Sequence, residues 1–91
     1  MTATLTMAIP VHDDAKALAQ LLSRLEPVSN ALARVIVVDD GSPLPLEKDR
    51  LALPEGVPFT LLRHDRALGP GAARNRALDA VESPHLIFLD A

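Results

Sequence analysis

Two spacings of apolar residues follow one another in the first third of the chain. Residues 4–9 alternate more and less apolar side chains, which predicts a strand that Pro10 is expected to end. Leucines then recur between residues 18 and 25 at positions i, i+3, i+4 and i+7, the spacing of one apolar helix face. The aspartates at 13–14 are possible N-caps of this helix, and Pro27 is expected to stop it.

The rest of the chain continues to alternate strands and helices. Residues 35–38, Val-Ile-Val-Val, are a wholly apolar β-branched run, which predicts a strand buried on both faces. A proline-rich stretch follows and leaves room at best for a two-turn helix over residues 46–53. The remaining predicted elements are strands at 59–62 and 86–89 and a helix at 71–82. The order β-α-β-α-β-α-β predicts an α/β fold, with a mainly parallel sheet and flanking helices.

Composition narrows the class of protein. The 91 residues are 48% hydrophobic, as expected for one globular domain, and no cysteine is available for disulfides or thiolate chemistry. A net charge of −3 and the lack of Trp and Tyr argue against nucleic-acid binding, which uses basic patches and aromatic platforms. No signal peptide or membrane-spanning apolar stretch is recognisable, so we expect a cytoplasmic protein. Because the chain ends directly after an apolar strand, we expect it to be a truncated part of a larger domain.

Polar residues gather where the predicted strands end. Ligands of open α/β sheets bind outside the carboxyl ends of the strands. These ends, and the turn before the last helix, carry His12-Asp13, Asp39-Asp40-Gly41-Ser42, His64-Asp65-Arg66, Leu68-Gly69-Pro70-Gly71 and Asp90. Carboxylates suit Mg²⁺ or Mn²⁺ and ribose hydroxyls, and a glycine-rich turn before a helix suits phosphate.

The same segments also have purely structural interpretations. Residues 39–42 are typical of a simple turn, and residues 69–71 of an ordinary loop. His64 is expected to be a solvated surface residue. Arg74 lies near a helix N-terminus, where a cation is unfavourable, and this favours an anion facing it. Asp90 is harder to explain structurally, because buried strands normally end in neutral turn residues.

Four sequence blocks occur in a recognisable order. They are Met7-Ala8-Ile9-Pro10-Val11-His12-Asp13-Asp14, Val37-Val38-Asp39-Asp40-Gly41-Ser42, Gly69-Pro70-Gly71-Ala72-Ala73-Arg74-Asn75 and Phe88-Leu89-Asp90-Ala91. Family 2 glycosyltransferases of the GT-A fold typically show Pro-Val-Tyr-Asn, Val-Asp-Asp-Gly-Ser, Gly-x-x-x-Ala-Arg-Asn and Leu-Asp-x-Asp in this order. Residues 1–91 as a whole therefore resemble the N-terminal, Rossmann-like, donor-nucleotide-binding part of that family.

The resemblance implies where the nucleotide base would bind. Pro10, Val11 and His12 would line the pocket of the base, with His12 standing where the family usually has Tyr. Asp13 takes the place of the usual Asn of this nucleotide-binding set and lacks its amide donor. Asp40, followed by Gly41, would accept a hydrogen bond from the base, typically from N3–H of uracil or thymine.

The resemblance also implies where the diphosphate and the metal would lie. The stretch that contains Gly69, Gly71 and Arg74 would border the nucleotide, with Arg74 near the diphosphate. Asp90 would be the first Asp of the Asp-x-Asp motif, which contacts ribose and a divalent metal, Mg²⁺ or Mn²⁺. The chain ends at Ala91, in the middle of that motif, so we expect the metal to be held weakly by Asp90.

The implied activity is that of a hexosyltransferase. A UDP-sugar or dTDP-sugar is the expected donor, and the sugar is expected to pass with inversion, assisted by the metal, to an acceptor hydroxyl. The base that deprotonates the acceptor would lie outside this chain, so no catalytic residue is expected within it. We therefore expect the chain alone to be inactive.

Three other interpretations stay open at this point. Asp39-Asp40 and Asp90 also resemble the acidic residues of a receiver domain, a Mg²⁺-dependent phospho-acceptor signalling module. The Gly-Pro-Gly-Ala-Ala-Arg-Asn block would have no role there, and beryllofluoride binding would reveal a receiver. A sugar nucleotidyltransferase would need a glycine-rich signature directly after the first strand, where residues 10–14 stand instead. A degenerate, purely structural domain is the third alternative.

Overall fold

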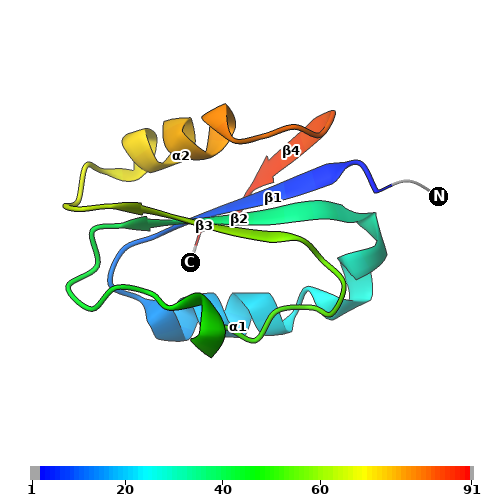
Figure 1. Cartoon of the computed structure of the whole chain (residues 1–91), viewed down its shortest axis with the longest axis horizontal. Helices are drawn as coiled ribbons and strands as arrows, with labels where there is room; N and C mark the ends of the chain where they lie inside the picture. The colour runs from blue at the N-terminus through cyan, green and yellow to red at the C-terminus, as the bar shows by residue number, and fades with distance from the viewer. Residues whose placement is uncertain (1–2, 91) are drawn as a thin grey trace.

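A four-stranded parallel sheet lies between two helical layers in the computed structural model, which describes residues 3–90 (Figure 1). The strands are β1 (Leu5–Val11), β2 (Leu32–Asp40), β3 (Phe59–His64) and β4 (His85–Phe88), in the order β3-β2-β1-β4. The helices are α1 (Ala15–Ser23) and α2 (Pro70–Asp79), with 3₁₀ turns η1 (Glu26–Ala31) and η2 (Lys48–Arg50). All three strand pairs are parallel, so the predicted α/β class is confirmed.

The two faces of the sheet bury different kinds of side chain. On the α1 face, Val35 and Val37 pack with Leu18 and Leu22 of the helix. On the α2 face, Ile36 and Val38 pack with small residues of α2, which include Ala73. Residues 35–38 are thus buried on both faces, as their apolar run predicted.

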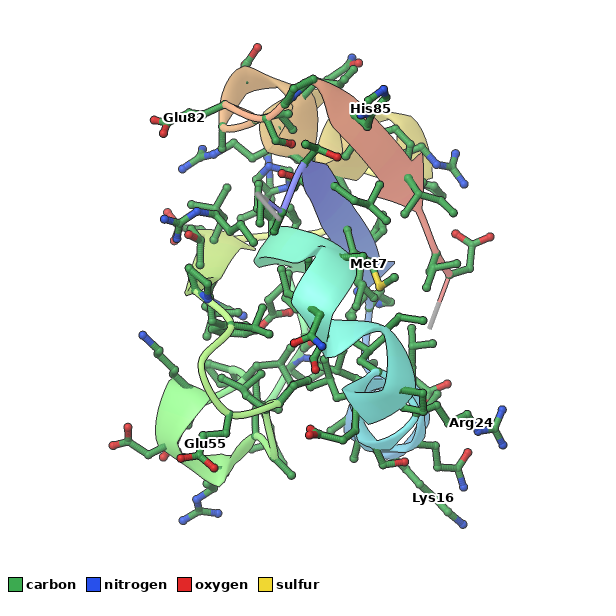
Figure 2. The ribbon with its side chains drawn as sticks, turned by 90° about the vertical axis from the view of Figure 1, so that its right-hand side faces the viewer. Met7, Lys16, Arg24, Glu55, Glu82 and His85 are labelled. Carbon is green, nitrogen blue, oxygen red and sulfur yellow. The ribbon has the colours of Figure 1, made fainter. Side chains whose placement is uncertain are left out.

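The helix α1 is amphipathic in the way that its leucine spacing predicted. Figure 2 shows Lys16 and Arg24 pointing away from the sheet, whereas Met7 of β1 lies between the sheet and this helix. The Asp14 side chain caps the helix by accepting a hydrogen bond from the Ala17 amide at 3.1 Å. Pro27 does not stop α1, which ends at Ser23; it lies in the following 3₁₀ turn η1.

The strand β1 continues through Pro10 to Val11, against the expectation that proline would end it. Even-numbered residues of β1 bond to β4, since the Ala8 carbonyl accepts from the Leu89 amide at 3.0 Å. The Pro10 nitrogen points to the same side, but the ladder between β1 and β4 ends at Ala8 and Phe88. The proline therefore lies beyond the last paired residues of this ladder, where a missing N–H does not interrupt it.

The predicted helix over residues 46–53 is wrong. The structure has a single 3₁₀ turn there, η2, within an extended connection. Prolines at 43, 45, 54 and 58 surround it and restrict helical backbone. The apolar residues of this stretch instead pack against the core on the α1 side. They are Leu46, Leu51 and Leu53.

Across the part of the chain that the structure describes, no helix is long and apolar enough to cross a membrane.

Candidate functional site

A pocket of about 450 Å³ opens at the carboxyl ends of the strands, between the sheet and the start of α2. It is lined by Pro10, Val11, His12, Asp40, Ala67, Gly69, Pro70, Ala73, Arg74 and Asp90. Seven of the ten residues that the sequence selected are among them, whereas Asp13, Gly41 and Gly71 are not. Because parallel strands end at one edge, segments as distant as residues 10 and 90 meet here.

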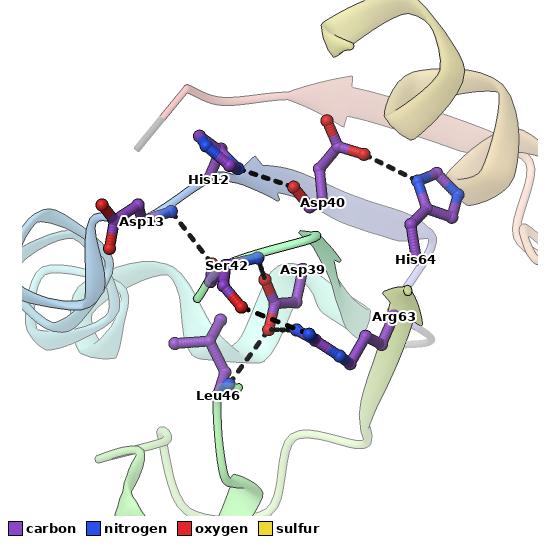
Figure 3. Close-up of polar contacts among 8 residues, drawn as sticks. All are labelled: His12, Asp13, Asp39, Asp40, Ser42, Leu46, Arg63 and His64. Atoms are coloured by element: carbon purple, nitrogen blue, oxygen red, sulfur yellow. Dashed lines mark hydrogen bonds and ion pairs between the residues drawn. The ribbon is translucent and has the colours of Figure 1, made fainter. Parts of the chain in front are cut away.

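The end of β1 supplies one wall of the pocket, with His12 as its aromatic ring. His12 Nδ1 lies 2.7 Å from the backbone carbonyl oxygen of Asp40. A carbonyl oxygen only accepts hydrogen bonds, so Nδ1 carries the proton and donates it. The ring is therefore oriented by the end of β2, as Figure 3 shows.

Asp40 lies at the end of β2, and the residue is 5% exposed. Its Oδ1 accepts hydrogen bonds from His64 Nδ1 at 2.8 Å and from the Leu68 amide at 2.9 Å, and its Oδ2 accepts one from the Gly69 amide at 2.9 Å. Burial acts to raise the pKa of Asp40, but the Leu68 amide, His64 and the Gly69 amide together hold it below its ordinary value. The pocket thus contains an ionised carboxylate.

Asp39, the preceding residue, faces the opposite side of the sheet and does not line the pocket. It is fully buried and accepts hydrogen bonds from the Ser42 and Leu46 amides, both at 3.0 Å, and from Arg63 Nη1 at 2.7 Å. Burial acts to raise its pKa, yet these donors, led by the Leu46 amide, lower it overall. Asp39 therefore holds the loop after β2 in place (Figure 3).

Gly41 lies beneath the loop before α2 rather than in the pocket. Its φ is +70°, and a Cβ at this position would collide with the backbone of Arg66 and Ala67. Only glycine permits both this backbone conformation and this close approach. The approach brings the amides of residues 68 and 69 within reach of Asp40.

The start of α2 forms the wall opposite β1. Gly69 is the N-cap residue with φ +102°, and Pro70 follows at the first helical position. The free amides and the dipole of a helix N-terminus favour an anion. One turn further on, Arg74 Nη2 lies 3.3 Å from Asp90 Oδ1, so the end of the chain contributes a carboxylate beside an arginine. Gly71 lies at the helix start with open space around it.

Asp13 lies just outside the pocket, in the turn between β1 and α1. Its φ of +48° makes it a non-glycine residue in the left-handed region. Its amide donates to Ser42 Oγ at 2.9 Å, which ties this turn to the loop after β2. Its backbone, through Ser42, therefore connects the site to the loop that Asp39 holds.

The site contains residues that the sequence did not predict. His64 was expected to be solvated, but it is 9% exposed and bonded to Asp40. Ala67, Pro70 and Ala73 add apolar surface to the pocket. The available signal was the position of His64 at the end of the strand next to β2, where a side chain can reach Asp40.

Asp90, the residue that the resemblance assigns to a metal ion, would supply one carboxylate. Within residues 3–90, no group of three or more His, Cys, Asp or Glu side chains is arranged to hold a metal. Asp90 is 81% exposed at its side chain and is paired with Arg74. A single carboxylate fits a Mg²⁺ ion that takes its other ligands from phosphates and water.

Comparison with known proteins places this arrangement in a family. The model of Glycosyl transferase family 2 matches residues 6–91. The pre-mycofactocin glycosyltransferases of Mycobacterium tuberculosis strains CDC 1551 / Oshkosh and ATCC 25618 / H37Rv are each 38% identical to the chain over 86 residues, 94% of its length. The aligned segment is 17% of the length of these relatives, so the chain spans about a sixth of them. The chain belongs to glycosyltransferase family 2.

Proposed function

We propose that this chain is the donor-nucleotide-binding part of a glycosyltransferase that uses a nucleotide-diphosphate sugar. The observation that carries the proposal is the pocket itself, in which an ionised Asp40, the His12 ring and the N-terminus of α2 meet at one edge of the sheet. Family membership supports glycosyl transfer in general and weighs against the receiver domain and the purely structural domain.

The two ends of the pocket suit the two ends of a nucleotide. The base would stack against His12 and donate to Asp40. An acceptor at this point suits uracil or thymine through N3–H, and it can also accept from N1–H of guanine. The diphosphate would lie toward the N-terminus of α2 and Arg74, where amides, dipole and guanidinium all favour negative charge. Asp90 would accept from ribose hydroxyls.

The reaction that follows from this binding is a direct displacement. The acceptor oxygen forms a bond to the anomeric carbon while the bond from that carbon to the diphosphate oxygen breaks, and the electron pair leaves with the nucleoside diphosphate. The acceptor proton passes to a base that lies outside these residues. Within this chain, Arg74 and the start of α2 would stabilise the charge that develops on the leaving group.

Asp90 also offers a position for a divalent cation. Asp90 would hold it together with phosphate oxygens, and a bound cation would add further charge stabilisation to the leaving diphosphate.

The experiment that tests this function is an amide-resolved NMR titration of the protein with UDP, dTDP and GDP, each with and without Mg²⁺. We expect shifts at residues 11–12, 40–41, 69–74 and 90, and the relative affinities for UDP, dTDP and GDP will rank the bases. Asp49→Asn, an exposed change in η2, is the matched control and should bind as the wild type does. A folded protein whose amides respond to none of these nucleotides would contradict the proposal.

A further inference from the structure

The carboxylate of Asp40 is held by donors on three sides. A carboxylate has about four lone-pair positions. Among the described residues, three donors occupy three of them: His64 Nδ1 and the Leu68 amide on Oδ1, and the Gly69 amide on Oδ2. One acceptor position remains, on Oδ2, and Asp40 lines the pocket.

His64 is the one side chain among these three donors. It is 9% exposed, and its Nδ1 must donate because an ionised carboxylate only accepts. It reaches Asp40 from the end of β3, the neighbouring strand, where residues 40 and 64 are paired in register. Figure 3 shows the imidazole against one carboxylate oxygen, with the other oxygen turned away from it.

A carboxylate that is held in place and ionised selects among bases differently from one that can rotate or take up a proton. With Oδ1 saturated, the pocket offers a base a hydrogen-bond acceptor and no donor at this point. A base whose ring nitrogen carries a hydrogen, such as uracil, can pair with it. Cytosine presents a lone pair at the same ring position, so two acceptors would face each other without a hydrogen.

We propose that His64 is a positioning residue that makes the pocket select bases with a ring N–H, because it fixes the oxygen of Asp40 that faces the base. This inference rests on the proposed function and adds a residue that does not itself line the nucleotide pocket. His64 acts through Asp40 and touches no reacting atom.

The test compares UDP with CDP in the wild type and in two variants at His64, by isothermal titration calorimetry. His64→Asn retains an N–H donor close to the position of Nδ1, and His64→Leu removes it. We expect the wild type to prefer UDP at least ten-fold, His64→Asn to keep that ratio within about three-fold, and His64→Leu to lower it about ten-fold. A general loss of structure would weaken both nucleotides alike and leave the ratio unchanged.

The outcomes separate this inference from the proposed function. A wild type that binds neither nucleotide overturns both. A wild type that prefers UDP, together with a folded His64→Leu variant that keeps the full preference, overturns the role of His64 alone.

A second measurement covers the case in which His64→Leu does not fold. The ring nitrogens of His64 in the wild type are followed by ¹H–¹⁵N NMR during the same titrations. We expect a proton on Nδ1 and a shift of its resonance with UDP that is larger than with CDP. A ring without a proton on Nδ1, or an equal response to the two nucleotides, overturns the proposal.

Discussion

Asp39 and Asp40 show how consecutive residues of one type take different roles. Successive side chains of a strand point to opposite faces, so Asp40 turns toward the pocket and Asp39 toward the interior of the α1 side. Each carboxylate accepts three hydrogen bonds, but those of Asp39 come from the loop that follows it and from Arg63. One is suited to bind a ligand, and the other stabilises the structure that holds the first.

The lowered pKa of Asp39 predicts an acid-sensitive fold. A carboxyl group whose pKa is lower in the folded state than its unfolded value of about 3.9 takes up protons more readily when unfolded. Its contribution to stability is therefore complete above about pH 4 and is lost as pH falls through the folded pKa. Urea unfolding between pH 2.5 and 7 should show this decline, and Asp39→Asn should make it shallower. An unchanged pH dependence in that variant would contradict the role of Asp39.

Substitution of Arg74 should weaken ligand binding and leave the stability of the fold nearly unchanged. Its ion pair with Asp90 joins side chains that are 42% and 81% exposed, and such surface pairs contribute about 0–1 kcal/mol. We expect Arg74→Gln to change the free energy of unfolding by less than about 0.5 kcal/mol. Its affinity for UDP should fall about ten-fold, the loss of roughly one charge-assisted hydrogen bond, while its affinity for uridine should not change. Calorimetric titration with both ligands checks this, and an equal loss for the two would contradict a contact with the diphosphate.

At the scale of elements, the loop between β3 and α2 depends on the turn after β2. The backbone at residues 66–67 lies so close to Gly41 that no Cβ fits between them. This contact belongs to the same loop whose next two amides bind Asp40. The geometry of the pocket is therefore set partly by a residue that does not line it.

The chain offers a matched pair of glycines to test this dependence. Gly41 and Gly56 both have positive φ, +70° and +81°, but nothing lies within 4 Å of a Cβ built at Gly56. Gly56→Ala should lower the free energy of unfolding by about 1 kcal/mol, because only backbone strain is added. Gly41→Ala adds a collision with the backbone of residues 66–67. We therefore expect it to lower the free energy of unfolding by at least about 2 kcal/mol and to weaken UDP binding. If urea unfolding shows the same loss of free energy of unfolding in both variants, the loop can move aside freely and the dependence is contradicted.

What the sequence predicted correctly was local, and what it missed depended on neighbours. The apolar run at 35–38 and the leucine spacing at 18–25 each carry their own periodicity, so their elements followed directly. Pro10 was expected to end its strand because the rule for proline assumes a partner on both sides, and here β4 has already ended. His64 was expected to be solvated because only the pairing of β3 with β2 brings it to Asp40.

At the scale of the whole molecule, one face of the sheet carries most of the core and the other face carries the pocket. The α1 face buries the larger cluster of leucine, isoleucine and valine, whereas the pocket opens on the α2 side. Ile9 belongs to the α1 cluster and is fully buried. Ile9→Val should therefore lower the free energy of unfolding by about 0.5–1.5 kcal/mol and leave UDP affinity within two-fold of the wild type. Urea unfolding and calorimetry on the same sample test this, and a marked loss of affinity would show that the faces are coupled.

The missing N–H of Pro10 has a consequence for how the site meets its ligand. Pro10 can donate no hydrogen bond toward β4, and the ladder between β1 and β4 ends before it, at Ala8 and Phe88, next to the pocket. A nucleotide entering there has no paired backbone to separate. The site is in this sense preorganised, because binding does not require the sheet to open.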